Sequence, residues 1–182
     1  MTPPPYTVNP KLVPPGASLV IIGMAAAGKT TIGQELASLL GIPQLDTDHI
    51  IEAHYGTDLH TVSKGLSKSA FLDLECAVIM RLNLKHCVIS TGGSAVYRPQ
   101  AVRHLKTLGP LIHISVPLPV IMERIARKPE RGLAIDPGQT LEDLYNERAA
   151  LYAEAADFTV EGGHAPAAVY ADKIACMLSL PQ

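Results

Sequence analysis

One short segment constrains this chain more than any other: residues 23–30 read GMAAAGKT and satisfy the pattern G-x-x-x-x-G-K-[ST]. An apolar run typical of a buried strand, residues 19–22, precedes the segment, and a helical pattern begins at Lys29. Glycines let such a loop turn so that successive backbone N–H groups meet phosphate oxygens, and the N-terminus of the next helix adds partial positive charge. The alternative is a glycine turn that only joins strand to helix. We interpret the segment as a nucleotide phosphate loop, for ATP or GTP.

Each fixed position of this loop predicts a role. A lysine at this position reaches the β- and γ-phosphates, and the hydroxyl that follows it ligates Mg²⁺. We therefore assign these roles to Lys29 and Thr30. The residues expected to surround the nucleotide phosphates are Gly23, Ala25, Ala26, Ala27, Gly28, Lys29, Thr30 and Thr31.

The remainder of the chain alternates short apolar runs with helical patterns. Such runs, separated by helices, are typical of a parallel sheet covered on both faces, so the sequence predicts an α/β fold. A proline- and glycine-containing stretch, residues 129–139, predicts a mobile loop, and Thr140 with Asp143 predicts a helix N-terminus. The expected strands are 19–22, 43–46, 87–90, 111–116 and 158–160. The expected helices are 29–40, 48–55, 67–84, 100–108, 118–128 and 140–156, followed by an alanine-rich closing helix.

Composition limits the organisation and the partners of the chain. Its 182 residues suffice for one domain, predicted over residues 18–182, while residues 1–17 hold six of the fifteen prolines and predict a flexible tail. A net charge of −2 disfavours nucleic acid and anionic membranes as partners. Three cysteines without a C-x-x-C pair are expected to be buried thiols in a reducing compartment, which predicts a cytoplasmic protein.

Two carboxylates, Asp46 and Asp48, follow the second predicted strand. In an open parallel sheet the carboxyl ends of the strands line the ligand crevice. One carboxylate there can hold Mg²⁺, and the other can bind or deprotonate an acceptor hydroxyl. Alternatively, Asp48 only caps the helix that begins at His49. A GTPase would need an Asn-Lys-x-Asp segment, which the chain lacks, and a dinucleotide-binding loop would need glycine where Ala25 stands.

These motifs resemble the shikimate kinase family, from residue 18 to about 175. The resemblance implies a P-loop NTPase fold of the nucleoside-monophosphate-kinase type, a three-layer sandwich with a five-stranded parallel sheet and a mobile lid at about 129–139. It also implies that Asp46 holds Mg²⁺, that Asp48 contacts the acceptor, and that Ser90-Thr91-Gly92-Gly93-Ser94 matches a glycine motif that approaches the acceptor. Three arginines match the family as well: Arg124 at the adenine, Arg131 on the lid at the transferred phosphate, and Arg148 at the carboxylate of the acceptor.

The chain departs from the family where the acceptor is expected. Leu72 stands in place of an arginine that would clamp the carboxylate and pair with the glutamate matched by Glu75, Ser94 replaces a glycine, and the lid reads Arg131-Gly132-Leu133-Ala134. A carboxylate left without its arginine needs another cation. An ammonium group on the acceptor would serve, which makes homoserine a candidate beside shikimate. Alternatively, Lys64 or Lys68 replaces the clamp.

The sequence thus predicts an ATP-dependent, Mg²⁺-requiring kinase, a monomer, that phosphorylates a hydroxyl of a small carboxylate-bearing metabolite, either homoserine or shikimate. Lys29, Asp48 and Arg131 are the predicted catalytic residues. Asp48, Glu75, Gly92, Gly93, Ser94 and Arg148 are predicted to bind the acceptor, and Thr30 and Asp46 the metal. A nucleotide or nucleoside kinase and a non-catalytic nucleotide-binding module are the alternatives.

Overall fold

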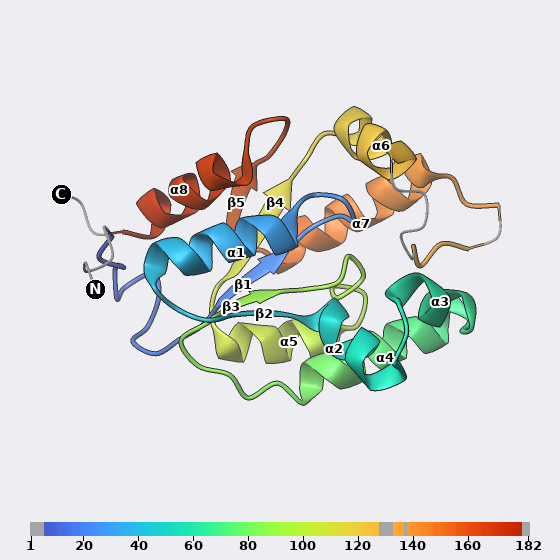
Figure 1. Ribbon diagram of the computed structural model, residues 1–182, viewed down its shortest axis with the longest axis horizontal. Helices are drawn as coiled ribbons and strands as arrows, with labels where there is room; N and C mark the ends of the chain where they lie inside the picture. Colours follow the sequence, from blue (N-terminus) through green and yellow to red (C-terminus); the bar gives the residue numbers. More distant parts are fainter. Residues whose placement is uncertain (1–5, 128–132, 137, 180–182) are drawn as a thin grey trace.

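The computed structural model describes residues 6–127, 133–136 and 138–179 and is built around one parallel sheet (Figure 1). In this part of the chain the sheet has five strands in the order β2-β3-β1-β4-β5. Their bounds are β1 (Leu19–Ile22), β2 (Gln44–Asp46), β3 (Val88–Ser90), β4 (Leu111–Ser115) and β5 (Phe158–Glu161). The predicted five-stranded parallel α/β fold is confirmed.

Helices cover both faces of this sheet and complete the predicted three layers. Helices α1 and α8 pack against each other on one side, and α5 lies on the other (Figure 1). The helices are α1 (Lys29–Leu40), α2 (Thr47–Tyr55), α3 (Leu59–Lys64), α4 (Lys68–Met80), α5 (Pro99–Leu108), α6 (Leu118–Arg127), α7 (Leu141–Ala155) and α8 (Ala167–Leu178). None of the described helices is long and apolar enough to cross a membrane.

Strand register explains why the predicted motifs meet. All four residues of β1 are buried, as expected for a central strand covered on both faces. Ile21 pairs with Ser90 of β3 and with Ile112 of β4, and Asp46 of β2 pairs with the same Ser90. The loops that follow β1, β2 and β3 therefore all start at the carboxyl ends of the strands, next to the N-terminus of α1.

Several element boundaries differ from the sequence prediction. The short helix α3 was not predicted, although Asp58 caps it through the backbone N–H of Thr61. Helix α4 ends at Met80 rather than at residue 84, and Leu82 reaches the core from the turn that follows. The predicted capping box at the start of α7 is confirmed, because Thr140 and Asp143 bond to each other's backbone N–H.

Residues 6–17, predicted to belong to a flexible tail, contact the domain. Val8 forms a bridge with Ser179, the N–H of Asn9 donates to the carbonyl of Leu178, and Val13 is part of the core. These partners lie at the far end of the sequence, so no local pattern around the prolines predicts them.

The cysteines also differ from the prediction that all three are buried, since Cys176 is exposed and only the other two are buried.

Candidate active site

The loop between β1 and α1 has the shape that a phosphate site requires. Gly23 has a φ of 145°, and a Cβ there would lie 2.7 Å from the backbone oxygen of Ile114, so no larger residue fits. Gly28, with a φ of 95°, caps α1 in the left-handed region that favours glycine. The first residue of α1 follows directly, which points the free N–H groups of the helix N-terminus into the loop.

Lys29 spans this loop from inside. Its Nζ donates hydrogen bonds to the carbonyls of Gly23, at 2.8 Å, and Met24, at 2.9 Å, and the side chain is buried. These two bonds hold the ammonium group inside the loop, at the place where the motif predicts contact with phosphate oxygens. The role of Lys29 at the β- and γ-phosphates stays a prediction.

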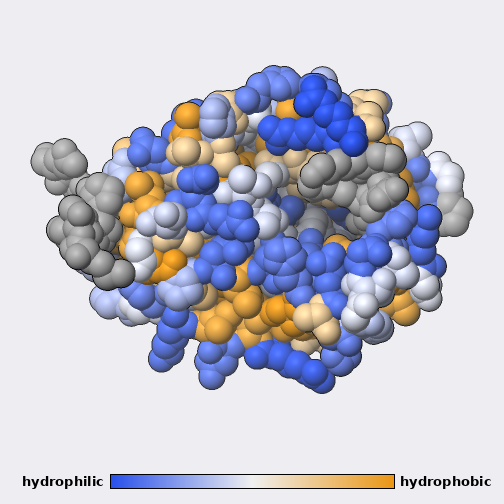
Figure 2. Space-filling model, in the orientation of Figure 1, coloured by the Kyte–Doolittle hydropathy of each residue, from blue (hydrophilic) through white to orange (hydrophobic). Residues whose placement is uncertain are grey.

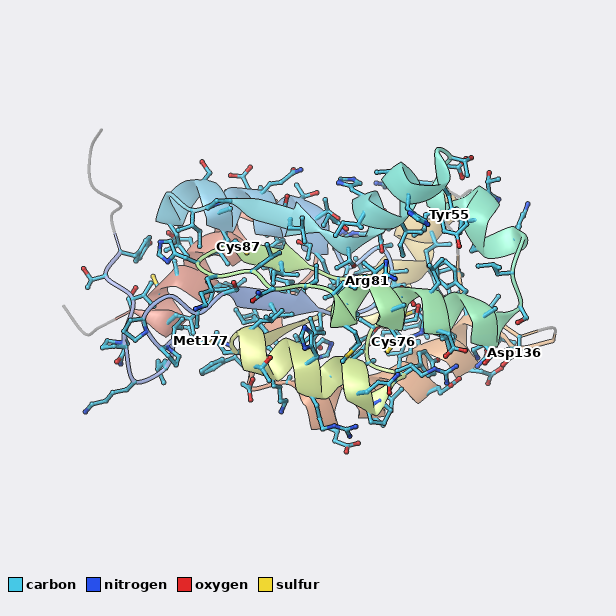
Figure 3. The ribbon with its side chains drawn as sticks, turned by 90° about the horizontal axis from the view of Figure 1, so that it is seen from below. Tyr55, Cys76, Arg81, Cys87, Asp136 and Met177 are labelled. Atoms are coloured by element: carbon cyan, nitrogen blue, oxygen red, sulfur yellow. The ribbon has the colours of Figure 1, made fainter. Side chains whose placement is uncertain are left out.

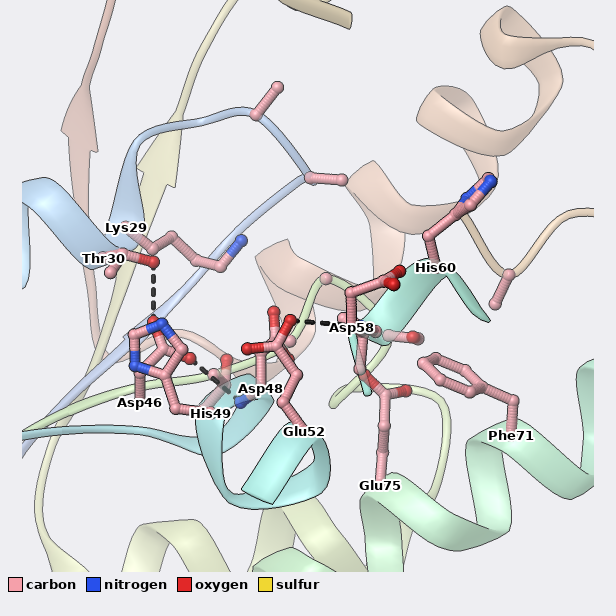
Figure 4. A pocket seen from close by; sticks show the side chains of 18 of the residues that line it. Lys29, Thr30, Asp46, Asp48, His49, Glu52, Asp58, His60, Phe71 and Glu75 are labelled. Carbon is pink, nitrogen blue, oxygen red and sulfur yellow. Dashed lines mark hydrogen bonds between the residues drawn. The ribbon is translucent and has the colours of Figure 1, made fainter. Parts of the chain in front are cut away.

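Thr30 and Asp46 form the expected pair of hard oxygen donors. Thr30 Oγ1 donates to Asp46 Oδ2 at 2.6 Å, while Asp46 Oδ1 accepts the N–H of Asp48 and so caps α2 (Figure 4). The helix cap is therefore Asp46, and the alternative that Asp48 is only a cap is wrong. A hydroxyl beside a carboxylate suits Mg²⁺, which keeps several waters and takes few protein ligands.

A cavity of about 300 Å³ opens beside the phosphate loop. Figure 4 shows acidic side chains from β2, α2, α4 and the segment before α3 facing it, and in Figure 2 hydrophilic residues lie below the hollow in this face. Five carboxylates line it, against one lysine and one arginine among the described residues. They are Asp46, Asp48, Glu52, Asp58 and Glu75, with Lys29 and Arg148.

Two of these carboxylates, the partly buried Asp48 and the buried Glu75, are incompletely bonded. Asp48 Oδ1 and Glu75 Oε2 have no hydrogen-bond partner among the described residues. Burial raises the pKa of Asp48 to about 6, with Asp46 adding to the rise, and burial raises the pKa of Glu75 to about 7. Unpaired buried oxygens are rare in folded proteins, so they mark places where a ligand is expected to donate.

Both carboxylates converge on the loop after β3. A Cβ on Gly92 would clash with Glu75 Oε1 and lie 2.8 Å from Asp48 Oδ1, so only glycine allows them to approach this backbone. The Ser94 side chain, where the resemblance predicts glycine, donates a hydrogen bond to Glu75. The structure thus brings together Asp48, Glu75, Gly92 and Ser94, as the sequence predicted.

Arg148 of α7 completes the cavity from the opposite side. It is 1% exposed, its Nη2 donates to the carbonyl of Ala134 at 3.1 Å, and its Nε lies 3.4 Å from the hydroxyl of Tyr97. Gly93 allows this approach, because a Cβ there would lie 3.1 Å from Arg148 Nη1. These partners are neutral, so the guanidinium remains able to bind an anion in the cavity.

Arg124, the arginine predicted at the adenine, lies apart from the acceptor residues. Arg124 of α6 donates to the carbonyls of Ala26 and Ala27, at 3.0 and 3.3 Å, and to that of Gly163, so it lies against the outer side of the phosphate loop. Arg131 lies outside the described residues. Of the predicted lid, Ala134 is buried and lines the cavity.

Sequence reasoning missed several residues of the cavity. Glu52 accepts the N–H of Leu59, and Asp58 caps α3, so both reach the cavity because α3 folds against α2. Tyr97 is outside the cavity lining, but its ring centre lies 5.3 Å from the guanidinium carbon of Arg148. The short helix carried one sequence signal, Asp58 three residues before Thr61. No signal predicted the long-range Tyr97 contact.

Comparison with known proteins adds an independent line of observation. A family model described as shikimate kinase matches residues 25–179. A shikimate kinase of Cupriavidus pinatubonensis is 34% identical over 166 residues, which cover 90% of this chain and 86% of that protein. A shikimate kinase of Neisseria meningitidis is 34% identical over 149 residues, covering 80% of this chain and 88% of that protein.

Solved structures agree with these sequence matches. The shikimate kinase from Acinetobacter baumannii in complex with shikimate superposes with a TM-score of 0.82 at 31% identity, covering 90% of this chain and 93% of that one. The shikimate kinase from Aquifex aeolicus gives a TM-score of 0.73 at 28% identity, with coverage of 88% and 95%.

Proposed function

Because this chain belongs to the shikimate kinase family, we propose that it transfers the γ-phosphate of ATP to a hydroxyl group of a small metabolite that carries a carboxylate. Membership of the family establishes a phosphotransferase that acts on an alcohol group and uses ATP with Mg²⁺. The observation that carries the proposal is the cavity that joins the phosphate loop to Asp48 on one side and Arg148 on the other.

At the phosphate end, Lys29 and the loop N–H groups hold the β- and γ-phosphates, and Thr30 with Asp46 holds Mg²⁺. The 2.6 Å contact between Thr30 Oγ1 and Asp46 Oδ2 supports this, because it places two ligand types that Mg²⁺ prefers side by side. Bound Mg²⁺ neutralises part of the charge on the phosphate oxygens. Lys29 adds a fixed positive charge that needs no reorganisation during the reaction.

At the acceptor end, Asp48 orients the hydroxyl group and Arg148 the carboxylate. The acceptor oxygen forms a bond to the γ-phosphorus, the bond from this phosphorus to the bridging oxygen breaks, and ADP leaves. The hydroxyl proton passes to Asp48. Two properties of Asp48, which lines the cavity, support this role: one of its oxygens has no hydrogen-bond partner among the described residues, and its pKa is raised to about 6 by burial.

Segment 133–136 supplies the cover that such a reaction needs. Ala134 packs in a cluster with Leu72 and receives the hydrogen bond from Arg148, and Asp136 pairs with Lys68 at 2.7 Å beside the first turn of α4 (Figure 3). A covered site excludes water, which would otherwise accept the phosphate and turn the kinase into an ATPase. In this proposal Arg131 contributes charge at the transferred phosphate.

Two acceptors fit this proposal, shikimate and homoserine. Shikimate is favoured by the names of the relatives and by the bound shikimate of the Acinetobacter baumannii structure. Homoserine is favoured by Leu72, which is buried among apolar side chains and gives the acceptor carboxylate one arginine instead of two. Lys68 does not replace that arginine, since its Nζ is engaged by Asp136, and Lys64 is exposed and lies outside the cavity lining.

The test is the release of ADP from Mg-ATP with each acceptor in turn. We expect one of the two to increase the rate at least about 100-fold over the rate with water alone. The variants Lys29→Ala and Asp48→Asn are expected to lose this increase while they remain folded, as judged by circular dichroism. Turnover that neither acceptor stimulates would contradict the proposal.

A further inference from the structure

Carboxylates outnumber cations around the cavity, and the proposed function leaves one carboxylate, Glu75, without a partner. Asp46 is bonded to Thr30, Asp58 caps α3, and Glu52 accepts a backbone N–H. Asp48 and Glu75 alone of the five carboxylates are each left with a buried oxygen that has no partner among the described residues. The acceptor hydroxyl satisfies Asp48 under the proposed function, but nothing in that proposal satisfies Glu75.

No described residue forms an ion pair with Glu75, although Arg148 and Lys29 act on it electrostatically. Leu72, three residues earlier on the same face of α4, packs with Ile51 and Val62 instead of supplying a charge. Lys29 is held by two carbonyls of the phosphate loop, and Arg148 forms no ion pair with Glu75 among the described residues. The Ser94 hydroxyl gives Glu75 one neutral donor. A buried carboxylate in this state is stabilised by a proton or by a positively charged partner, and a ligand that enters the cavity can supply that partner.

The position of Glu75 relates this missing cation to the acceptor. Glu75 and Asp48 converge on Gly92, so a ligand bonded to Asp48 lies next to Glu75. Arg148 faces the same cavity and takes the carboxylate. The cavity therefore offers three distinct contacts to one small molecule. Asp48 can accept a hydrogen bond from a hydroxyl group, Glu75 can bind a cation, and Arg148 can bind an anion.

We infer that the acceptor is a zwitterion, a hydroxylated amino acid whose ammonium group is bound by Glu75 and whose carboxylate is bound by Arg148. This inference rests on the proposed kinase function and narrows its acceptor class. The convergence of Glu75 and Asp48 on one backbone position places the ammonium group and the hydroxyl close together, so the acceptor is compact. Homoserine has these three groups on a four-carbon chain, whereas shikimate has no amine.

The test compares acceptors that differ only in the amine. L-homoserine and 4-hydroxybutyrate share the hydroxyl and the carboxylate, and 4-hydroxybutyrate lacks the ammonium group; shikimate is the third acceptor. With Mg-ATP and ADP release as the readout, we expect kcat/KM for homoserine to exceed that for 4-hydroxybutyrate and for shikimate at least about 100-fold, because an amine-free ligand leaves Glu75 unpaired. Equal or better use of either amine-free acceptor overturns the inference and leaves the kinase function standing.

Substitution of Glu75 in α4 tests whether this residue causes the preference for an acceptor with an amine. Glu75→Gln is expected to lower kcat/KM for homoserine at least about 30-fold, mainly through KM, and to affect the use of 4-hydroxybutyrate much less. Glu52→Gln is the matched control, since it removes a carboxylate of the same cavity that a backbone N–H already occupies, and it should retain the preference for the amine. An equal loss for both acceptors in Glu75→Gln would indicate a structural role and contradict the inference.

A charge added at position 72 provides the converse test. Leu72→Arg places a guanidinium three residues from Glu75 on the same helix, where it competes with the acceptor amine. Use of homoserine is expected to fall at least about tenfold, while Leu72→Met, which conserves volume, keeps it. If no acceptor stimulates ADP release in the wild type although Mg-ATP binds, the proposed kinase function itself fails, and this outcome is distinct from a loss of amine preference.

Discussion

The pH dependence of stability tests whether Glu75 is as isolated as the structure indicates. Burial raises the pKa of Glu75 from its ordinary value of 4.5 to about 7 in the folded chain. The folded state therefore binds the proton more tightly than the unfolded state does. This group contributes stability below pH 4.5 that is lost as the pH rises to about 7, and each unit of the difference corresponds to about 1.4 kcal/mol.

The magnitude follows from these two values. Between pH 4.5 and pH 8 the ligand-free protein should lose about 3 kcal/mol of its free energy of unfolding through Glu75. Glu75→Gln removes the charge but keeps the shape, so the variant should be more stable than wild type at pH 8 and similar to it at pH 5. Urea denaturation followed by circular dichroism measures both values. Because Asp48 raises the pKa of Glu75, the variant Asp48→Asn should reduce the effect.

A wild-type protein whose stability relative to Glu75→Gln does not fall between pH 5 and pH 8 would refute this reasoning. Such a result would mean that a cation of the chain already pairs with Glu75. It would also remove the physical basis for an external ammonium group.

Three further predictions concern single side chains. Lys29→Ala should lower kcat at least about 100-fold while the protein remains folded, and a normal rate would exclude Lys29 from the chemistry. Thr30→Ala should raise the Mg²⁺ concentration needed for half-maximal ADP release, since it removes one of two proposed ligands; an unchanged Mg²⁺ dependence would contradict that assignment. Thr140→Ala should destabilise the protein by about 1 kcal/mol in urea denaturation through loss of the cap of α7, with no change in the KM for ATP. A loss of ATP affinity there would mean that α7 contributes to nucleotide binding.

The fold was predictable from the sequence because its signals are local. The apolar run before Gly23 and the glycines at both ends of the loop identify β1 and the start of α1, and α1 has the predicted bounds, Lys29–Leu40. The predicted boundary between tail and domain is wrong because long-range packing decides which residues are buried. Val13 is buried because Val8 and Asn9 dock on residues 178 and 179, which no pattern in a proline-rich segment indicates.

The same distinction between local signals and long-range packing applies to the candidate site. Motif spacing singled out Lys29, Thr30 and Asp46, and the structure brings Thr30 and Asp46 together because one loop and one helix cap position them. The family resemblance singled out Glu75, because Leu72 stands where its arginine is expected. The sequence did not predict that Glu75 and Asp48 approach the same backbone position, Gly92, because this contact requires the tertiary structure.

Direct detection of the product tests the central claim, that phosphate passes from ATP to the hydroxyl of a small carboxylate-bearing acceptor. The protein would be incubated with Mg-ATP and L-homoserine or shikimate and followed by ³¹P nuclear magnetic resonance. The account predicts a phosphomonoester signal that grows as the γ-phosphate signal of ATP declines, and with homoserine rather than shikimate if Glu75 binds an amine. A decline that yields inorganic phosphate alone, or no decline with either acceptor, would contradict it.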